Sequence, residues 1–161
     1  MAVSEIIGAA VGVILLVIVA YVVVGSTLFA AETVTTAQKD LTLQQEARVR
    51  TAFAVTDVRY NTSIIHANIT NTGTEIIGDF KHMDVLVYDA GLNKYQEYPY
   101  STENPPTAPQ SWGIDDRYNE FIHPYELDPG ETYRIRINTG SSPRWFQITT
   151  ANGVSASAFV V

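Results

Sequence analysis

The residues that could perform chemistry are few in this sequence. Its histidines are His66, His82 and His123. None of them stands at a metal-binding spacing from a second histidine or a carboxylate, such as positions i and i+4 of a helix. We therefore predict no metal centre, and only a cluster assembled from distant segments by the fold would change that expectation.

A second candidate is a group of acids with the oxygen ligands that Ca²⁺ prefers, Glu103, Asp115, Asp116 and Glu120. Their spacing does not match a dedicated calcium loop, so we interpret them as solvated surface charge. The sequence contains no Gly-x-Ser-x-Gly, P-loop or dinucleotide fingerprint, and it has no cysteine. The net charge of −7 disfavours nucleic-acid binding. We expect a protein that is not an enzyme and that uses no cofactor, metal or small-molecule substrate.

Two segments match the acceptor pattern for N-glycosylation, Asn61-Thr62-Ser63 and Asn68-Ile69-Thr70. Asn68 lies inside a predicted strand, which makes it the poorer acceptor unless that face of the strand is exposed. The two motifs together favour a C-terminal part on the cell exterior.

The longest feature of the chain is the apolar run from 6 to 31, which holds no charged residue. A helix of this length exceeds the roughly 30 Å hydrocarbon core of a bilayer, at about 1.5 Å per residue. No basic residue precedes the run and it is longer than the core of a secretory signal, so we expect it to be retained. A domain of this size could not bury an all-round apolar helix. Lipid, or a bundle of identical helices in a filament core, must cover it.

Small residues near the start of this run suit helix packing. Gly8 and Gly12 form a G-x-x-x-G step, a spacing that lets a second helix approach closely. Glu5 precedes the run, where a carboxylate is favourable at a helix N-terminus. In a filament it could also meet the terminal amine of a neighbouring subunit.

Helical spacing continues from 32 to 50, with Val34, Ala37 and Leu41 on one face and polar side chains elsewhere. We predict one continuous helix that leaves the apolar environment as a stalk and ends between residues 47 and 50. The predicted N-terminal unit is therefore 1–50.

After Thr51 the period of the sequence changes from helical to twofold. The segments with β-branched and aromatic residues in local alternation are 52–60, 63–70, 83–89, 132–138, 145–150 and 154–161. Turns rich in glycine, asparagine and proline separate them, and no helical pattern intervenes. We predict an all-β, immunoglobulin-like antiparallel β-sandwich over 51–161.

The interval from 95 to 125 breaks this rhythm. Its four prolines before residue 110 argue against a regular central strand, so we predict a long loop. The interval also concentrates aromatic residues, namely Tyr95, Tyr98, Tyr100, Trp112, Tyr118, Phe121 and Tyr125. Either they contact a partner, with Tyr98, Tyr100, Trp112 and Tyr118 as the candidates, or they pin the loop to the sandwich.

Several segments in fixed order carry a resemblance to a known family. These are AQKDLTLQQEARVRTAFAVTDVRYN, ANITNTGTEII, MDVLVYD, LDPGETYRIRI and TTANGVSASAFVV. Their order resembles the archaeal motility proteins called FlaF (ArlF), accessory components of the archaellum. The head AVSEIIGAAVGVILLVIVAYVVVG is also similar to the N-terminal segments of archaellins and archaeal type IV pilins. The resemblance implies an immunoglobulin-like β-sandwich outside the cytoplasmic membrane.

The resemblance leaves two hypotheses open. A FlaF-like protein would anchor the archaellum to the S-layer or another envelope protein, whereas an archaellin or pilin would polymerise through its apolar helix. The absence of a short basic leader before Met1 favours the anchor, and Glu5 with the glycine step keeps the filament subunit open. The expected partners are envelope proteins, archaellum components, the membrane and further copies of the chain, as a dimer or a helical filament. The expected location is the archaeal cell surface. A third hypothesis, a membrane-tethered enzyme or solute-binding module, has no motif in its favour.

Overall fold

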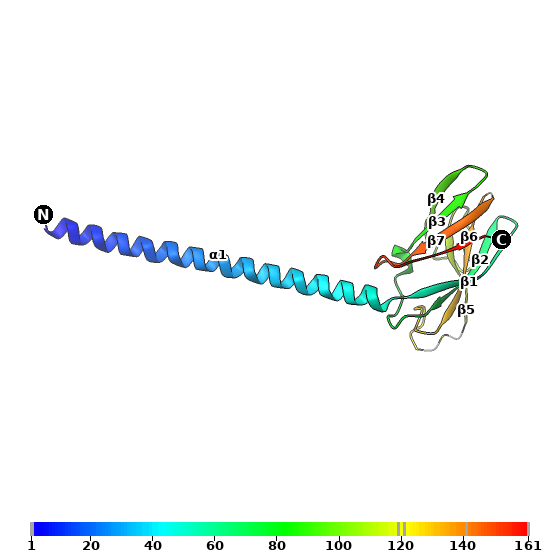
Figure 1. Cartoon of the computed structure of the whole chain (residues 1–161), viewed down its shortest axis with the longest axis horizontal. Coiled ribbons are helices and arrows are strands. Elements are labelled where there is room, and N and C mark those ends of the chain that lie inside the picture. Colours follow the sequence, from blue (N-terminus) through cyan, green and yellow to red (C-terminus); the bar gives the residue numbers. More distant parts are fainter. Residues whose placement is uncertain (1, 119, 121, 141, 161) are drawn as a thin grey trace. The chain divides into compact units, whose positions relative to one another are not determined.

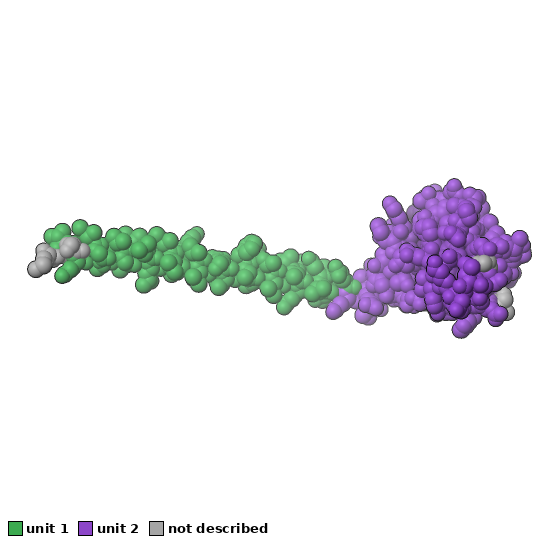
Figure 2. Space-filling model, turned by 90° about the horizontal axis from the view of Figure 1, so that it is seen from above, with its two compact units in different colours: residues 1–44 green, residues 45–161 purple. Residues whose placement is uncertain are grey.

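A computed structural model describes residues 2–118, 120, 122–140 and 142–160 of the chain. The outermost residues of the two predicted units, 1 and 161, and the aromatic residue Phe121 lie outside the described residues. The chain divides into two compact units, 1–44 and 45–161 (Figure 2). The predicted boundary after residue 50 therefore differs from this division, because the last turns of the helix belong to the second unit.

The N-terminal element is one helix, α1, which runs over Ala2–Arg50 (Figure 1). It contains no proline, so no residue removes a hydrogen bond from its interior. Hydroxyl groups in its middle and second half donate to carbonyl oxygens three or four residues earlier, as Ser26 does to Val23 and Thr33 to Phe29. These contacts satisfy the side-chain polar groups within the helix itself. The helix ends at Arg50, inside the predicted range.

The second unit is a sandwich of two four-stranded antiparallel sheets (Figure 1). The first sheet has the order β1 (Phe53–Asn61), β2 (Ile64–Asn71), β6 (Thr132–Asn138) and β5 (Trp112–Tyr118). The second has the order β4 (Lys94–Tyr98), β3 (Asp84–Asp89), β7 (Pro143–Thr149) and β8 (Ser155–Phe159). In immunoglobulin nomenclature these orders are A-B-E-D and C′-C-F-G. The predicted helix followed by an immunoglobulin-like β-sandwich is confirmed.

The core lies between the sheets and follows directly from the alternation in the sequence. In β2 the odd-numbered residues Ile65, Ala67 and Ile69 are buried, while the residues between them are partly exposed. A strand that covers a core on one side shows this period of two. A short 3₁₀ helix, Phe80–His82, adds the buried ring of Phe80 before β3 begins.

The prediction of one long loop from 95 to 125 is wrong, because two strands lie inside that interval. β4 occupies its start and β5 its middle, each at the edge of a sheet. The four prolines all fall between these strands, from Pro99 to Pro109, so none of them interrupts a ladder of hydrogen bonds. No proline lies within a strand here, as expected, but the residues before Pro99 and after Pro109 still form strands.

The loop 72–75 holds the last residue of α1 against the sandwich. The carbonyl oxygen of Arg50 accepts hydrogen bonds from the backbone N–H groups of Thr74, at 2.9 Å, and Glu75, at 3.3 Å. The carbonyl oxygen of Ala52 accepts from Gly73 at 2.8 Å. We call these contacts the junction clamp. They satisfy carbonyl groups that the end of a helix otherwise leaves without partners.

Gly73 is required in the junction clamp because the backbones approach closely there. A Cβ atom at this position would lie 2.5 Å from both the backbone nitrogen of Ala52 and the carbonyl oxygen of Arg50. Gly73→Ala is therefore expected to destabilise the second unit by about 1–3 kcal/mol, the usual cost of overpacking. The measurement is urea denaturation of the full chain in detergent. Gly140→Ala is the matched control, since a Cβ there meets nothing within 4 Å, and an equal loss in both variants would contradict the prediction.

Candidate functional site

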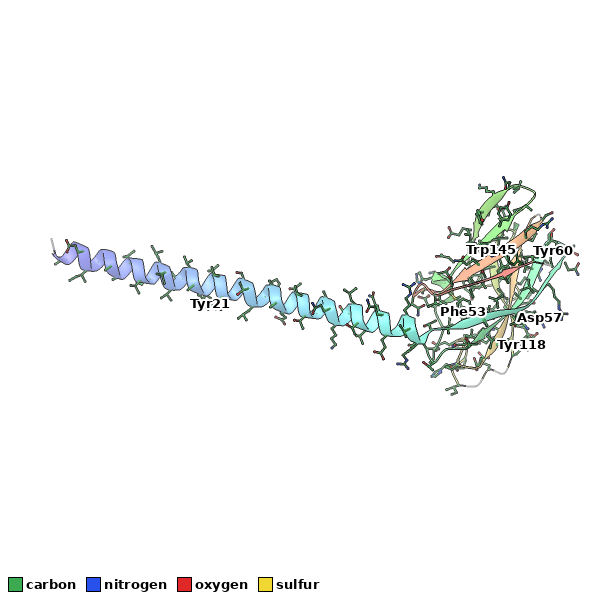
Figure 3. The ribbon with its side chains drawn as sticks, in the orientation of Figure 1. Tyr21, Phe53, Asp57, Tyr60, Tyr118 and Trp145 are labelled. Carbon is green, nitrogen blue, oxygen red and sulfur yellow. The ribbon has the colours of Figure 1, made fainter. Side chains whose placement is uncertain are left out.

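The most exposed apolar surface of the molecule is the N-terminal half of α1. Side chains such as Leu16, Tyr21 and Phe29 are exposed around the whole helix (Figure 3). The most apolar stretch has a mean hydropathy of 3.0 and is not buried by any part of the described chain. By length and composition α1 can cross a membrane, and it is the one helix in the described residues that can. A surface of this size in water would be strongly unfavourable, so it requires a cover.

The predicted packing residues lie at the start of this surface. A Cβ added at Gly8 or Gly12 would meet nothing within 4 Å, so both positions are open to a second helix. Glu5 lies in the first turn of α1, where its carboxylate faces the positive end of the helix dipole. Their predicted roles concern contacts with other chains and stay predictions.

The histidines are each paired with one aspartate, in contacts between the ring Nδ1 and a carboxylate oxygen. The pairs are His66–Asp115 at 3.3 Å, His82–Asp79 at 2.8 Å and His123–Asp128 at 2.9 Å. They lie in separate parts of the sandwich. Among the described residues, no group of three or more histidines and acids is arranged to hold a metal ion.

The four acids considered as calcium ligands have separate partners. The carboxylate of Glu103 accepts from the backbone N–H and hydroxyl of Thr107, and these bonds lower the pKa of Glu103. Asp115 faces His66 on the first sheet. Asp116 accepts from the backbone N–H of Arg117 at 2.9 Å, and Glu120 accepts from the backbone N–H of Tyr125 at 2.6 Å. The four therefore serve local structure rather than one shared site.

The pair of His123 and Asp128 is the best-defined electrostatic contact of the sandwich. Asp128 has a side chain only 4% exposed, and it accepts from both the backbone N–H and the ring Nδ1 of His123. The hydrogen bond to Asp128 raises the pKa of His123, and the nearby charges of Glu126 and Glu131 act in the same direction. The same hydrogen bond lowers the pKa of Asp128.

This pair makes stability depend on pH. The pKa of His123 lies above the ordinary 6.5, so the contribution of its charged form is complete below pH 6.5 and is lost as the pH rises through the raised pKa. The pKa of Asp128 lies below the ordinary 3.8, so its contribution is complete above pH 3.8 and is lost as the pH falls through the lowered pKa. Thermal unfolding should show a decline above pH 6.5 that His123→Gln removes. Parallel pH profiles of wild type and variant would contradict this.

The two glycosylation motifs have different surroundings. Asn61 ends β1 and is exposed next to the tight turn of Thr62 and Ser63, which have φ angles of 46° and 68°. Asn68 lies in the middle of β2, between Thr56 and Arg134 on the neighbouring strands, and is partly buried. A modifying enzyme could therefore reach Asn61 more easily than Asn68. Glycosylation at either position stays a prediction.

The aromatic residues predicted to contact a partner divide into two groups. Trp112 and Tyr98 are 0% and 2% exposed, so they belong to the core, and a surface contact through either is incompatible with that burial. Tyr100 packs edge-on against Trp112, with ring centroids 5.0 Å apart. Tyr118 is partly exposed beneath Arg134, whose guanidinium carbon lies 5.0 Å from the ring centroid. For the first three, the alternative that the aromatics pin the loop to the sandwich fits the structure.

A second set of aromatic residues lies on the outer face of the second sheet, where Tyr95 and Phe159 are exposed and Tyr88 and Trp145 are partly exposed; of these, the sequence analysis singled out Tyr95 alone. We call it the aromatic row, and it crosses all four strands in the order Tyr95, Tyr88, Trp145 and Phe159. The ring centroids of Tyr88 and Tyr95 lie 4.9 Å apart, and those of Tyr95 and Trp145 lie 6.0 Å apart. Figure 3 labels Trp145 on β7. Strand alternation would assign each residue to the outward face, but only the pairing register shows that they are neighbours.

Comparisons with known proteins identify solved structures to which this chain is similar. No family model matches the sequence, and no curated protein matches it. The archaellum periplasmic stator protein FlaG from Sulfolobus acidocaldarius is similar at 20% identity and a TM-score of 0.49, over 67% of this chain and 97% of that chain. The periplasmic stator complex of FlaF and FlaG from the same organism is similar at 23% identity and a TM-score of 0.46, over 66% of this chain and 85% of that chain. Both are archaellum stator proteins by name.

Proposed function

We propose that this chain is a non-catalytic structural component of the archaellum apparatus. In this proposal α1 anchors the chain in the cytoplasmic membrane. The β-sandwich lies outside and binds the S-layer or another protein of the cell envelope, as a stationary anchor. The ordered segments that resemble FlaF support the choice of apparatus.

The observation that carries the proposal is the uncovered apolar surface of α1. Transfer from water to lipid gains about 1.5–3 kcal/mol for each fully buried Val, Leu or Ile side chain. The run from 6 to 31 contains many such residues and is longer than the roughly 20 needed to span a bilayer. The charged residues Glu32, Lys39 and Asp40 follow it on the same helix, which favours a polar environment for the stalk.

The test is the topology of the chain in intact cells. The sequence has no cysteine, so a single cysteine introduced at a chosen site reports that site alone. Thr62 lies in the exposed turn after β1, and Val3 lies in the first turn of α1, near the N-terminus. A membrane-impermeant maleimide should label Thr62→Cys in intact cells and Val3→Cys only after lysis. Labelling of Val3→Cys alone in intact cells would overturn the proposed orientation.

A second candidate function is a filament subunit of the archaellin or pilin type. The open faces of Gly8 and Gly12 and the charge of Glu5 in the first turn favour it, because they suit a core of packed helices. Extraction of native membranes with mild detergent separates the two candidates. A monomer or dimer in the soluble extract supports the anchor, and sedimenting fibres support the filament subunit.

A further inference from the structure

We infer that the outer face of the β4-β3-β7-β8 sheet is the docking surface of the β-sandwich, and that its partner is a protein surface bearing arginine and lysine side chains. This inference deepens the proposed function, since it assigns a binding face and a partner chemistry to the envelope-binding domain. It starts from the aromatic row.

Packing of the sandwich does not account for the aromatic row. The residues that cover the core from these strands are their sequence neighbours, such as Val87 and Phe146, which are 1% and 0% exposed. The row points the other way, where a solvated antiparallel sheet normally carries polar side chains. Tyr95 is 58% exposed and Phe159 is 75% exposed. Tyrosine and tryptophan are enriched at protein interfaces and among their energetic hot spots.

Cross-strand pairing explains only part of the row. Contact between Tyr88 and Tyr95 stabilises the pairing of β3 with β4. Phe159 at the far edge is exposed and contributes little to such pairing. The row spans three strand spacings, about 14 Å, which is the scale of the centre of a protein interface rather than of a single contact.

The charges on this face are acidic. Below the aromatic row, the next outward positions on the four strands hold Glu97, Leu86, Gln147 and Ser157, followed by Asp84, Thr149 and Ser155. Glu97 and Asp84 are exposed. The basic residues of these strands, Lys94 and Arg144, lie at the strand ends beyond the row. An acidic face of this kind disfavours phosphate groups and complements a cationic surface.

Elsewhere in the domain, tyrosine rings form cation–π contacts with arginine side chains of the same chain. Arg134 lies over Tyr118 at 5.0 Å, and Arg117 lies over Tyr125 at 4.9 Å. Within the described part of the chain, no arginine or lysine lies over a ring of the aromatic row. A cation from another protein could supply that interaction, and tryptophan is its strongest acceptor among the aromatic residues.

The geometry of the rings also distinguishes between ligands. The plane of Tyr95 is inclined by 44° to that of Tyr88 and by 87° to that of Trp145. Rings so inclined do not form one flat platform on which a sugar chain could lie. Each ring instead presents its own face or edge. A single guanidinium group could contact one ring face and the carboxylate of Glu97 together.

The test uses the full chain in detergent and a labelled peptide of alternating arginine and serine. A peptide of alternating glutamate and serine is the charge control, and a linear glucose hexasaccharide is the glycan probe. We expect the arginine peptide to bind most tightly, with weakening at high salt. Tyr95→Ala and Glu97→Gln should each reduce its affinity about tenfold, which is typical of a hot-spot residue. Ile122→Ala and Asp116→Asn are exposed controls away from this face and should not.

Three outcomes would overturn the inference. Equal losses in the face variants and the controls would mean that the peptide follows the overall negative charge. Tighter binding of the hexasaccharide, lost in Tyr95→Ala, would assign the face to a glycan. Binding of neither probe would leave the face without a cationic partner. Cysteine labelling tests the membrane anchor independently, so a correctly oriented chain that binds no arginine peptide refutes only this inference.

Discussion

Trp112→Ala should lower the free energy of unfolding of the β-sandwich by about 3–5 kcal/mol, the range for removing a large aromatic side chain from a core. The indole is fully buried, and Tyr100 packs against it edge-on. The start of β5 is also hydrogen-bonded to the loop after β4. The backbone N–H of Trp112 donates to the carbonyl oxygen of Pro99, and its carbonyl oxygen accepts from the backbone N–H of Ser101. Alanine would leave a cavity at the point where the loop after β4 meets the sheet. Amide hydrogen exchange of β2 and β6 measures the loss.

Trp112→Phe is the matched variant. The indole nitrogen is buried without a hydrogen-bond partner in the described structure, so phenylalanine removes an unsatisfied polar group together with some volume. We expect a clearly smaller loss than for alanine. The lower limit expected for Trp112→Ala is a loss of about 3 kcal/mol in the free energy of unfolding. A loss below about 1 kcal/mol would show that Trp112 is not part of a tightly packed core.

Val17→Arg should reduce the share of the chain that is integrated into the membrane. Val17 lies near the middle of the apolar run and is exposed on α1. Arginine at the centre of a membrane span costs about 2.5–3.5 kcal/mol of insertion free energy on translocon scales. A change of that size lowers the ratio of inserted to non-inserted chain by roughly a hundredfold. Resistance to extraction by alkaline carbonate measures the inserted fraction.

Thr36→Arg is the control for this prediction, because it adds the same charge to the polar part of the same helix. It should leave membrane integration unchanged. If Val17→Arg and Thr36→Arg were equally resistant to carbonate, the prediction that a charge in the apolar run weakens integration would be wrong. If both were lost, the effect would come from the charge of the chain and not from the depth of the residue.

The sequence predicts the elements whose burial is regular. α1 follows from a long uncharged run, and β2 and β6 follow from strict alternation of residues such as Ile65 and Ile135 with polar neighbours. β5 was missed because its register shifts between Ile114 and Asp116, which breaks the alternation. β4 was missed because its outward position Tyr95 is as apolar as its inward Tyr98, so no period of two appears.

The surface residues were harder to predict than the fold. Residue type marks Trp112 as a contact residue, but only the packing of the two sheets decides that it faces inward. The aromatic row brings together residues 88, 95, 145 and 159, which are neighbours through strand pairing alone. A single sequence indicates which residues of a strand face outward. The register that makes residues of distant strands neighbours comes only from the folded structure.

The junction clamp determines how the sandwich would respond to mechanical tension. Load that arrives through α1 reaches β1 at its first residue and, through the carbonyl oxygen of Arg50, is shared with the loop 72–75. The hydrogen bonds between β1 and β2 lie across the strand direction, so a pull along β1 shears many of them at once. A joint of this type resists force far better than one that opens bond by bond. The first strand of the sandwich is thus arranged to resist tension that reaches it along α1.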